Sequence, residues 1–224
     1  MLNEGIRLLK RGHYDRALTH LLNIHVESPE YPELSYYLGL CYTHLQRFDE
    51  ALLYLEQVVT SELSFTHVYQ SRMILGYIYS VTGRLHLAEF EFKKLLDDGF
   101  DSARTHAALG FVLHAQGERE RAMEELERAL ELDPDNAGAL NSLGFILADS
   151  EADVRRAVEY CRRAVRARPR NPAYLDSLGW AYFRLGRNDE ARDVLRQALE
   201  LAPGNKEIAA HLREVMHGKP ASRE

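Results

Sequence analysis

The chain has 224 residues and a formal net charge of −6 at pH 7. This acidic balance argues against a nucleic-acid-binding protein, because such proteins usually carry an excess of lysine and arginine. No stretch reaches the ~20 apolar residues that a membrane span needs, and Met1–Leu18 lacks the apolar run of a signal peptide. The sequence therefore predicts a cytoplasmic protein, or a periplasmic or envelope-associated one if a leader upstream of Met1 has been removed.

Two kinds of small residue recur along the chain with a common spacing. The two series are Gly5, Gly39, Gly76, Gly110, Gly144 and Gly179, and Ala17, Ala51, Ala88, Ala122, Ala157 and Ala191. Both advance by about 34 residues, a length typical of helix–turn–helix repeats. We interpret each repeat as two helices that approach closely where glycine meets alanine, because a larger side chain there would push the helices apart.

The repeats follow one another with three irregularities. Their approximate bounds are 1–31, 32–65, 69–101, 102–136, 137–171 and 172–205. Gln46 stands at a turn between helices where glycine is common. Additional residues within Ser61–Val68 predict a longer second helix in the second repeat or a longer loop after it. One additional residue, within Asp149–Asp153, falls between the helices of the fifth repeat.

The first repeat and the last predicted helix are more polar than the repeats between them. Residues 205–217 place Ile208, Leu212 and Val215 on one face, which predicts a capping helix, and 218–224 predict a flexible tail. Glu4 occupies a position that is leucine in most other repeats. Polar terminal faces favour a monomer.

The repeat from Pro172 to Asn205 carries the fullest sequence pattern. It reads L-x2-L-G-x2-Y, then A-x3-L, then P, through Leu175, Leu178, Gly179, Tyr182, Ala191, Leu195 and Pro203. This pattern resembles the tetratricopeptide repeat. The resemblance implies an all-α fold, an α-α superhelical solenoid of helix-turn-helix repeats that forms a single domain over residues 1–217. It also implies a scaffold that binds other proteins.

The resemblance further implies a concave groove lined by the first helix of each repeat. One stripe of each first helix packs on its neighbours, and a second stripe, shifted by one residue, faces this groove. The candidate groove residues are Tyr36, Leu40, Met73, Tyr77, Phe111, His114, Asn141, Phe145, Asp176, Trp180 and Phe183. The stripe holds no basic residue, so the resemblance does not extend to members that grip a C-terminal carboxylate. It suits an amphipathic helix or an extended apolar peptide.

An alternative interpretation makes these side chains part of the core. In a narrow groove they would contact the next helix and leave no room for a ligand. This alternative is as good as the groove interpretation for Phe111 and Phe145. It is weaker for Tyr36, Tyr77 and Trp180, whose polar atoms favour a position that reaches water.

A cluster of arginines on the second helix of the fifth repeat is a second candidate surface. Its members are Arg155, Arg156, Arg162, Arg163 and Arg166. On the convex side of a solenoid, such a patch would suit an acidic protein, a nucleic acid or an anionic lipid. We favour the alternative of a solvated surface, in which Glu159 offsets part of the charge.

The sequence lacks the common signatures of catalysis and cofactor binding. HExxH, CxxC, GxxxxGK[ST], GxGxxG and GxSxG are all missing. We therefore predict no enzymatic activity, no cofactor and no metal. Cys41 and Cys161 fall in the second and fifth repeats, too far apart for the ~7 Å separation of Cα atoms that a disulfide allows.

These observations predict a non-catalytic scaffold or adaptor that binds an apolar or amphipathic segment of another protein in its concave groove. One alternative is an accessory factor in cell-envelope assembly or secretion, because ALNSLGFILAD and YLDSLGWAYFRLGR resemble repeats of bacterial envelope-associated proteins. A less favoured alternative is the regulatory module of a larger enzyme, which would need a catalytic domain elsewhere in the gene.

Overall fold

The computed structural model describes residues 2–61 and 64–218, and the regular elements in these residues are thirteen α-helices and one 3-10 turn (Ser28–Glu30). None of the described helices is both long enough and apolar enough to cross a bilayer. Contacts between Cα atoms divide the chain into two compact units, an N-terminal unit of residues 1–101 and a C-terminal unit of residues 102–224.

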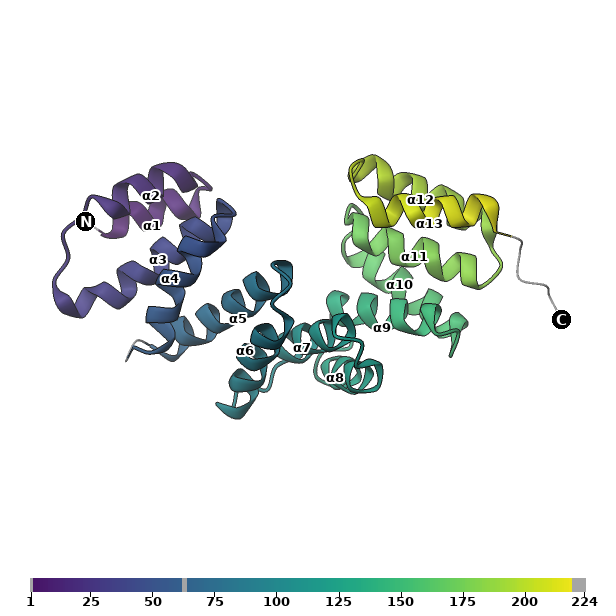
Figure 1. Cartoon of the computed structure of the whole chain (residues 1–224), viewed down its shortest axis with the longest axis horizontal. Helices are drawn as coiled ribbons and strands as arrows, with labels where there is room; N and C mark the ends of the chain where they lie inside the picture. Colours follow the sequence, from purple (N-terminus) through teal and green to yellow (C-terminus); the bar gives the residue numbers. More distant parts are fainter. Residues whose placement is uncertain (1, 62–63, 219–224) are drawn as a thin grey trace. The chain divides into compact units, whose positions relative to one another are not determined.

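The N-terminal unit consists of three helix pairs, each joined by a short turn (Figure 1). Its helices are α1 (Leu2–Lys10), α2 (Tyr14–Leu22), α3 (Tyr31–His44), α4 (Phe48–Val59), α5 (Phe65–Val81) and α6 (Leu85–Asp97). Each helix packs against the next along the chain, and α3 also contacts both α1 and α5. This pattern is the stacking of sequential helix pairs in which neighbouring repeats bury one another's apolar faces.

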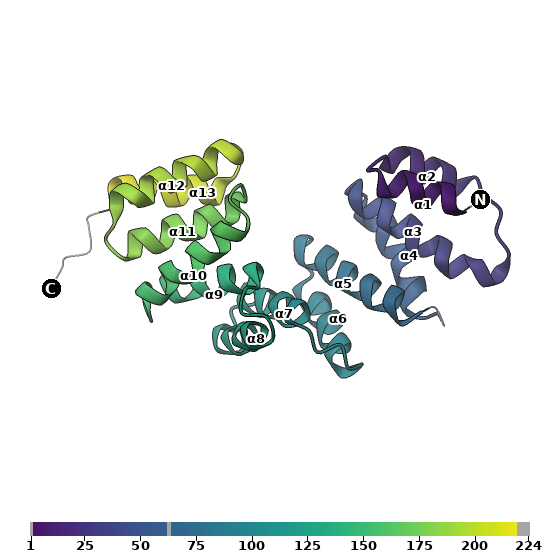
Figure 2. The ribbon, with the colours of Figure 1, turned by 180° about the vertical axis from the view of Figure 1, so that it is seen from behind.

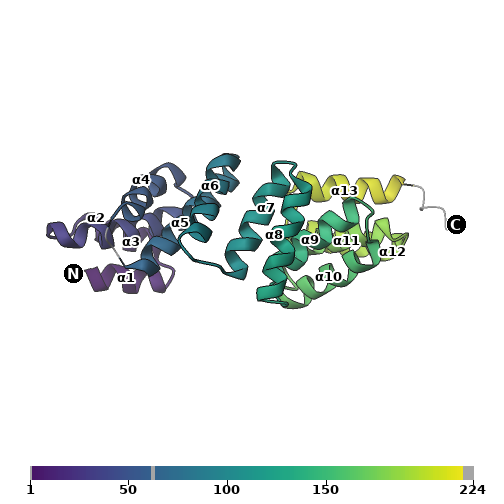
Figure 3. The same cartoon turned by 90° about the horizontal axis from the view of Figure 1, so that it is seen from below.

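The C-terminal unit consists of three further pairs and a final single helix (Figures 2 and 3). Its helices are α7 (Ala103–Ala115), α8 (Arg119–Leu132), α9 (Ala137–Asp149), α10 (Val154–Ala167), α11 (Pro172–Arg184), α12 (Asn188–Leu201) and α13 (Lys206–His217). The first helices α7, α9 and α11 and the final helix α13 contact one another in this order and form a row. Each second helix packs against both the helix before it and the helix after it.

Polar side chains at the predicted breaks begin the first helices of this unit. The Oδ1 atoms of Asn136 and Asn171 accept hydrogen bonds from the backbone N–H groups of Ala139 and Ala173, both at 3.0 Å. Asn205 caps α13 in the same way, through the N–H of Glu207 at 2.9 Å. Such caps satisfy backbone donors that the first turn of a helix leaves unpaired.

The recurring small residues lie where the two helices of a repeat touch, as predicted. A Cβ atom added to any of the six recurring glycines would lie 2.4–2.7 Å from a side-chain atom of the partner helix. The six recurring alanines are fully buried. Because no Cβ atom tolerates so short a separation, glycine is required for the observed distance between the paired helices.

The third repeat differs from the sequence-based expectation. We expected a longer second helix or loop near Ser61, but α4 has 12 residues and ends at Val59, whereas α5 has 17 residues and begins at Phe65. The prediction of a longer second helix is therefore wrong, and the additional residues lengthen the first helix of the third repeat. The ring of Phe65 lies 5.0 Å from that of Phe100, a contact that packs the additional turn onto the end of α6. Part of the expected loop, residues 62–63, and part of the expected tail, residues 219–224, lie outside the described residues.

Both cysteines are buried free thiols. Burial raises the pKa of Cys41 to about 11 and that of Cys161 to about 12. Since the thiolate is the reactive form, neither group is a nucleophile at neutral pH.

Left-handed residues close the turns between paired helices. Gly12, Gly83, Gly117 and Gly186 have φ angles between +75° and +85°. The second and fifth repeats place non-glycine residues in this conformation, with φ of +58° at Gln46 and +56° at Glu151. An L-residue in this region is strained by ~1–2 kcal/mol relative to the right-handed helix.

Replacing Gln46 with glycine should therefore raise the free energy of unfolding by about 0.5–1 kcal/mol, because the relief of strain exceeds the added chain entropy of glycine in the unfolded state. The side chain of Gln46 is exposed, so little packing is lost. Urea unfolding followed by circular dichroism measures the change. The reverse substitution at the equivalent turn, Gly117→Gln, is the matched control and should lose about 1 kcal/mol. A less stable Gln46→Gly variant would contradict this account of the turn.

Candidate functional site

A groove in the C-terminal unit gathers five of the predicted site residues. We call it the C-terminal groove; its volume is about 210 Å³, and it is lined by Phe111, His114, Asn141, Ser142, Phe145, Ala173, Asp176, Ser177 and Glu207. Three successive first helices, α7, α9 and α11, and the final helix α13 supply these residues. The predicted residues among them are Phe111, His114, Asn141, Phe145 and Asp176.

The position of these side chains follows from the helix packing. Gly110 and Gly144 face the second helix of their own repeat, as the short Cβ separations show. The next residue lies about 100° further round the helix, since an α-helix has 3.6 residues per turn. Phe111 and Phe145 therefore turn away from the second helices and toward the groove. The side chain of Phe111 is 53% exposed, so the core interpretation does not hold for it in this structure, whereas Phe145 is partly buried.

Trp180, expected to reach water, is buried instead, with 6% of its surface exposed. Its ring stacks on that of His211 at 4.5 Å, and the ring of Phe183 lies 5.5 Å away. His211 belongs to α13, the helix predicted only as a cap. The interpretation of Trp180 as an exposed groove residue is therefore wrong, because α13 covers it.

Sequence reasoning missed two residues of α13 at this site, His211 and Glu207. The side chain of Glu207 lines the groove, and that of His211 contacts both Trp180 and Asp176. His211 lies three positions after Ile208 and thus borders the apolar stripe of α13. A histidine that borders an otherwise apolar stripe of the capping helix was the available signal in the sequence.

An ion pair between α11 and α13 fixes the charge at one end of the groove. Nδ1 of His211 donates to the carboxylate of Asp176, at 2.9 Å and 3.0 Å from its two oxygens. Burial favours the neutral imidazole, but this hydrogen bond and the charges of Asp176, Glu207 and Glu214 outweigh it and raise the pKa of His211. The pair is largely buried, with Asp176 only 6% exposed.

His114 has the opposite electrostatic environment. Burial lowers its pKa, and the charge of Asp149 offsets this only in part, so the imidazole is neutral at pH 7. Its ring meets that of Phe145 edge-on, with centroids 5.9 Å apart. His114 therefore contributes an aromatic wall to the groove, without a positive charge.

Two buried polar atoms near the groove lack a hydrogen-bond partner among the described residues. They are Oδ1 of Asn141, which lines the groove, and Nε1 of Trp180. A buried polar atom without a partner costs about 1–3 kcal/mol of folding free energy. Oδ1 of Asn141 therefore lies beneath the surface of the groove, where an occupant does not reach it directly.

The predicted site residues of the N-terminal unit do not share one environment. Tyr36 is buried, its hydroxyl donates to Oε1 of Gln70, and its ring lies 4.5 Å from that of His67. Burial and the neighbouring Tyr37 raise the pKa of Tyr36 to about 12. The expectation that its hydroxyl reaches water is therefore wrong, because α5 covers it. Leu40 and Met73 are partly buried, and Tyr77 is 51% exposed.

Comparison with known families agrees with this architecture. A family model described as tetratricopeptide repeat matches residues 2–62 and 145–206, and a second, described as TPR repeat, matches residues 110–150. The chain belongs to the tetratricopeptide repeat family. Its repeats typically mediate protein–protein interactions, and its members are usually non-catalytic.

Similar proteins share the fold of this tetratricopeptide repeat chain at low sequence identity. TTC0263 of Thermus thermophilus, a thermophilic TPR protein, has a TM-score of 0.64 and 20% identity, over 83% of this chain and 98% of that one. YrrB, described as a TPR protein with an unusual peptide-binding site, has a TM-score of 0.55 and 18% identity, over 89% and 97%. The Cut9–Hcn1 structure has a TM-score of 0.79 and 13% identity, over 96% and 42%. A curated relative, Protein CTR9 homolog of Arabidopsis thaliana, is 35% identical over 77 residues, which are 34% of this chain and only 7% of that relative.

The predicted arginine patch of this repeat protein is partly engaged by its own neighbours. The contacts are Arg156 to Glu127 at 3.5 Å, Arg162 to the hydroxyl of Tyr182 at 2.8 Å and Arg163 to Asp135 at 2.9 Å. Arg155 and Arg166 are exposed. Two of the five charges are therefore paired with carboxylates, and the interpretation of a solvated surface stays a prediction.

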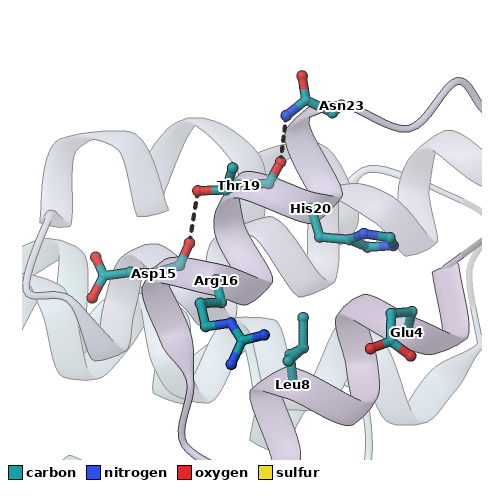
Figure 4. Close-up of a pocket in the computed structure, with 7 residues that line it drawn as sticks. All are labelled: Glu4, Leu8, Asp15, Arg16, Thr19, His20 and Asn23. Carbon is teal, nitrogen blue, oxygen red and sulfur yellow. Dashed lines mark hydrogen bonds between the residues drawn. The ribbon is translucent and has the colours of Figure 1, made fainter.

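A second depression lies on the first repeat, between α1 and α2 (Figure 4). Its volume is about 550 Å³, and it is lined by Glu4, Leu8, Asp15, Arg16, Thr19, His20 and Asn23. Thr19 and Asn23 donate to backbone carbonyls of their own helix, at 2.9 Å and 2.8 Å, and Glu4 pairs with Arg7 at 2.5 Å. These polar groups satisfy one another locally, so we do not place the functional site here.

Proposed function

We propose that this chain is a non-catalytic interaction module that binds an apolar or amphipathic segment of another protein in the C-terminal groove. The observation that carries this proposal is the common location of Phe111, His114, Asn141, Phe145 and Asp176, which three successive first helices bring to one groove. The same stripe of these helices supplies all five.

The size and lining of the groove favour a peptide over a small metabolite. Its volume of about 210 Å³ is below the ~300–1,000 Å³ of typical small-molecule sites. Exposed Phe111 and partly buried Phe145 offer apolar surface, and the partly buried Asn141 adds a polar side chain to the lining. Aromatic anchors beside a few polar groups are typical of peptide-binding surfaces. YrrB, which shares only the fold with this chain, is described as having a peptide-binding site, so this fold accommodates such a ligand.

The proposal is tested by comparing the proteins captured by wild type and by the double variant Phe111→Ala/Asn141→Ala. Bound proteins are identified by mass spectrometry after pull-down from the source cell. Each truncated anchor should cost about 1–2 kcal/mol of binding free energy, so a groove-bound partner should be retained at least ~10-fold less by the double variant.

Phe90→Ala is the matched control, because Phe90 is 58% exposed but lies on α6, in the N-terminal unit. It removes one exposed aromatic ring without touching the groove. All captured proteins should stay on this variant. If partners are still captured by the groove variant but are no longer captured by Phe90→Ala, then binding occurs elsewhere and the proposal is refuted.

A further inference from the structure

One end of the C-terminal groove carries carboxylate groups in addition to the aromatic walls. Glu207, in the first turn of α13, lines the groove beside Asp176 of α11. Asp176 is paired with His211, whereas the side chain of Glu207 has no ion pair or hydrogen bond within the described part of the chain. Glu207 therefore presents an unneutralised carboxylate to whatever occupies the groove.

The remaining described lining residues add π faces to this charge and no opposing cation. Among the described residues, no lysine or arginine lines the groove. His114 is neutral at pH 7, since burial lowers its pKa. Phe111 and Phe145 are aromatic rings that attract cations through their faces. The charge of Glu207 and the two rings thus both favour a cation.

We propose that the C-terminal groove selects a partner segment that places an arginine or lysine side chain against Glu207, beside the rings of Phe111 and Phe145. This inference rests on the proposed function and specifies the chemistry of the bound segment. The aliphatic stem of such a side chain covers apolar walls while its head reaches a carboxylate. An acidic segment is disfavoured, because its carboxylates would meet Glu207 without a basic group to pair with.

Selection from random peptides tests which chemistry the groove prefers. Short random peptides displayed on phage are panned against the full wild-type chain, and each enriched clone is then tested on Phe111→Ala/Asn141→Ala. Clones that bind wild type but do not bind the double variant depend on the groove. Their sequences should be enriched in arginine or lysine next to an apolar residue.

The two proposals fail in different ways. Groove-dependent clones without a basic residue would overturn the cation preference and leave the proposed function standing. Enriched clones that bind the double variant as well as wild type, or a selection without any groove-dependent clone, would overturn the proposed function itself.

Charge removal at one position then tests the contact with Glu207. A fluorescein-labelled peptide made from a selected clone is titrated by anisotropy against wild type, Glu207→Gln and Glu214→Gln. Glu214 is the matched control, because it is an exposed glutamate on the same helix that does not line the groove. The Kd should rise about fivefold for Glu207→Gln, the magnitude of a partly exposed ion pair, and stay unchanged for Glu214→Gln.

A double-mutant cycle completes the test. Replacing the basic residue of the peptide with glutamine should weaken binding to wild type by a larger factor than it weakens binding to Glu207→Gln, because only wild type loses the ion pair as well as the contact with the rings. Equal weakening by Glu207→Gln and Glu214→Gln would show a general charge effect and would overturn the inference. Independent effects of the peptide and protein substitutions would overturn it as well.

Discussion

Replacing Gly110 with valine is expected to lower the free energy of unfolding by about 2–3 kcal/mol, because it overpacks the contact between α7 and α8. A Cβ atom at Gly110 would lie 2.7 Å from Cγ of Leu126 and 3.0 Å from the carbonyl oxygen of Ala122. Leu126 can change rotamer, but the carbonyl belongs to the backbone of α8 and moves only with the helix. Intrinsic helix propensity favours valine over glycine, so a net loss reports on crowding alone. Urea unfolding at neutral pH measures the change.

Two further variants test the explanation. Ala122→Leu overpacks the same contact from the other helix, since Ala122 is fully buried, and should also lose about 1–3 kcal/mol. Gly204→Ala is the control, because a Cβ atom there would meet nothing within 4 Å. If Gly110→Val and Ala122→Leu both unfold like wild type, the pairing of these two positions is wrong.

The parts of the fold that the sequence predicts are those set by short-range geometry. The glycine and alanine series identify the helix pairs because each pair forms within one repeat, where the two helices must touch at fixed positions. Turn residues behave alike, since Gln46 adopts the left-handed conformation that its position in the repeat requires. In each case the residues that determine the local structure lie within about one repeat of one another, so the spacing of the repeats reveals them.

The features that sequence reasoning missed depend on contacts that the repeat pattern does not include. Phe65, in the additional turn of α5, contacts Phe100, which follows the end of α6. Trp180 is buried because α13 brings His211 onto its ring. A repeat pattern assigns each residue to a stripe, but it does not show which stripe positions the next helix covers. Apolar character alone therefore did not separate exposed Phe111 from buried Trp180.

The same reasoning explains why only part of the candidate groove could be predicted. Consecutive repeats supply Phe111, Asn141 and Asp176. All three lie on the stripe of the first helices that the repeat pattern assigns to the groove. Glu207 comes from the capping helix, which lacks the glycine that defines the register. Its place in the groove depends on how α13 packs against α11 and α12, a contact that no repeat signature encodes.

Asp176→Asn is expected to destabilise the packing of α13 on α11 by about 2 kcal/mol at pH 6, because it removes a charge-assisted hydrogen bond from a largely buried pair. The pKa of His211 is raised in the folded state. The contribution of the pair is therefore complete below the unfolded-state pKa of histidine, ~6.5, and is lost as the pH rises through the higher folded-state value. The difference in unfolding free energy between wild type and Asp176→Asn should accordingly be larger at pH 6 than at pH 9.

Trp180 makes this difference directly measurable. It is the single tryptophan of the chain and stacks on His211 at 4.5 Å, so its fluorescence during urea unfolding reports on the environment that α13 creates. Asp193→Asn is the matched control, since Asp193 is an exposed aspartate on α12 and should change stability by less than ~0.5 kcal/mol at either pH. A loss for Asp176→Asn that is the same at pH 6 and pH 9 would mean that His211 is not the titrating partner. A loss that grows with pH would mean that the neutral imidazole is the form that holds α13 in place.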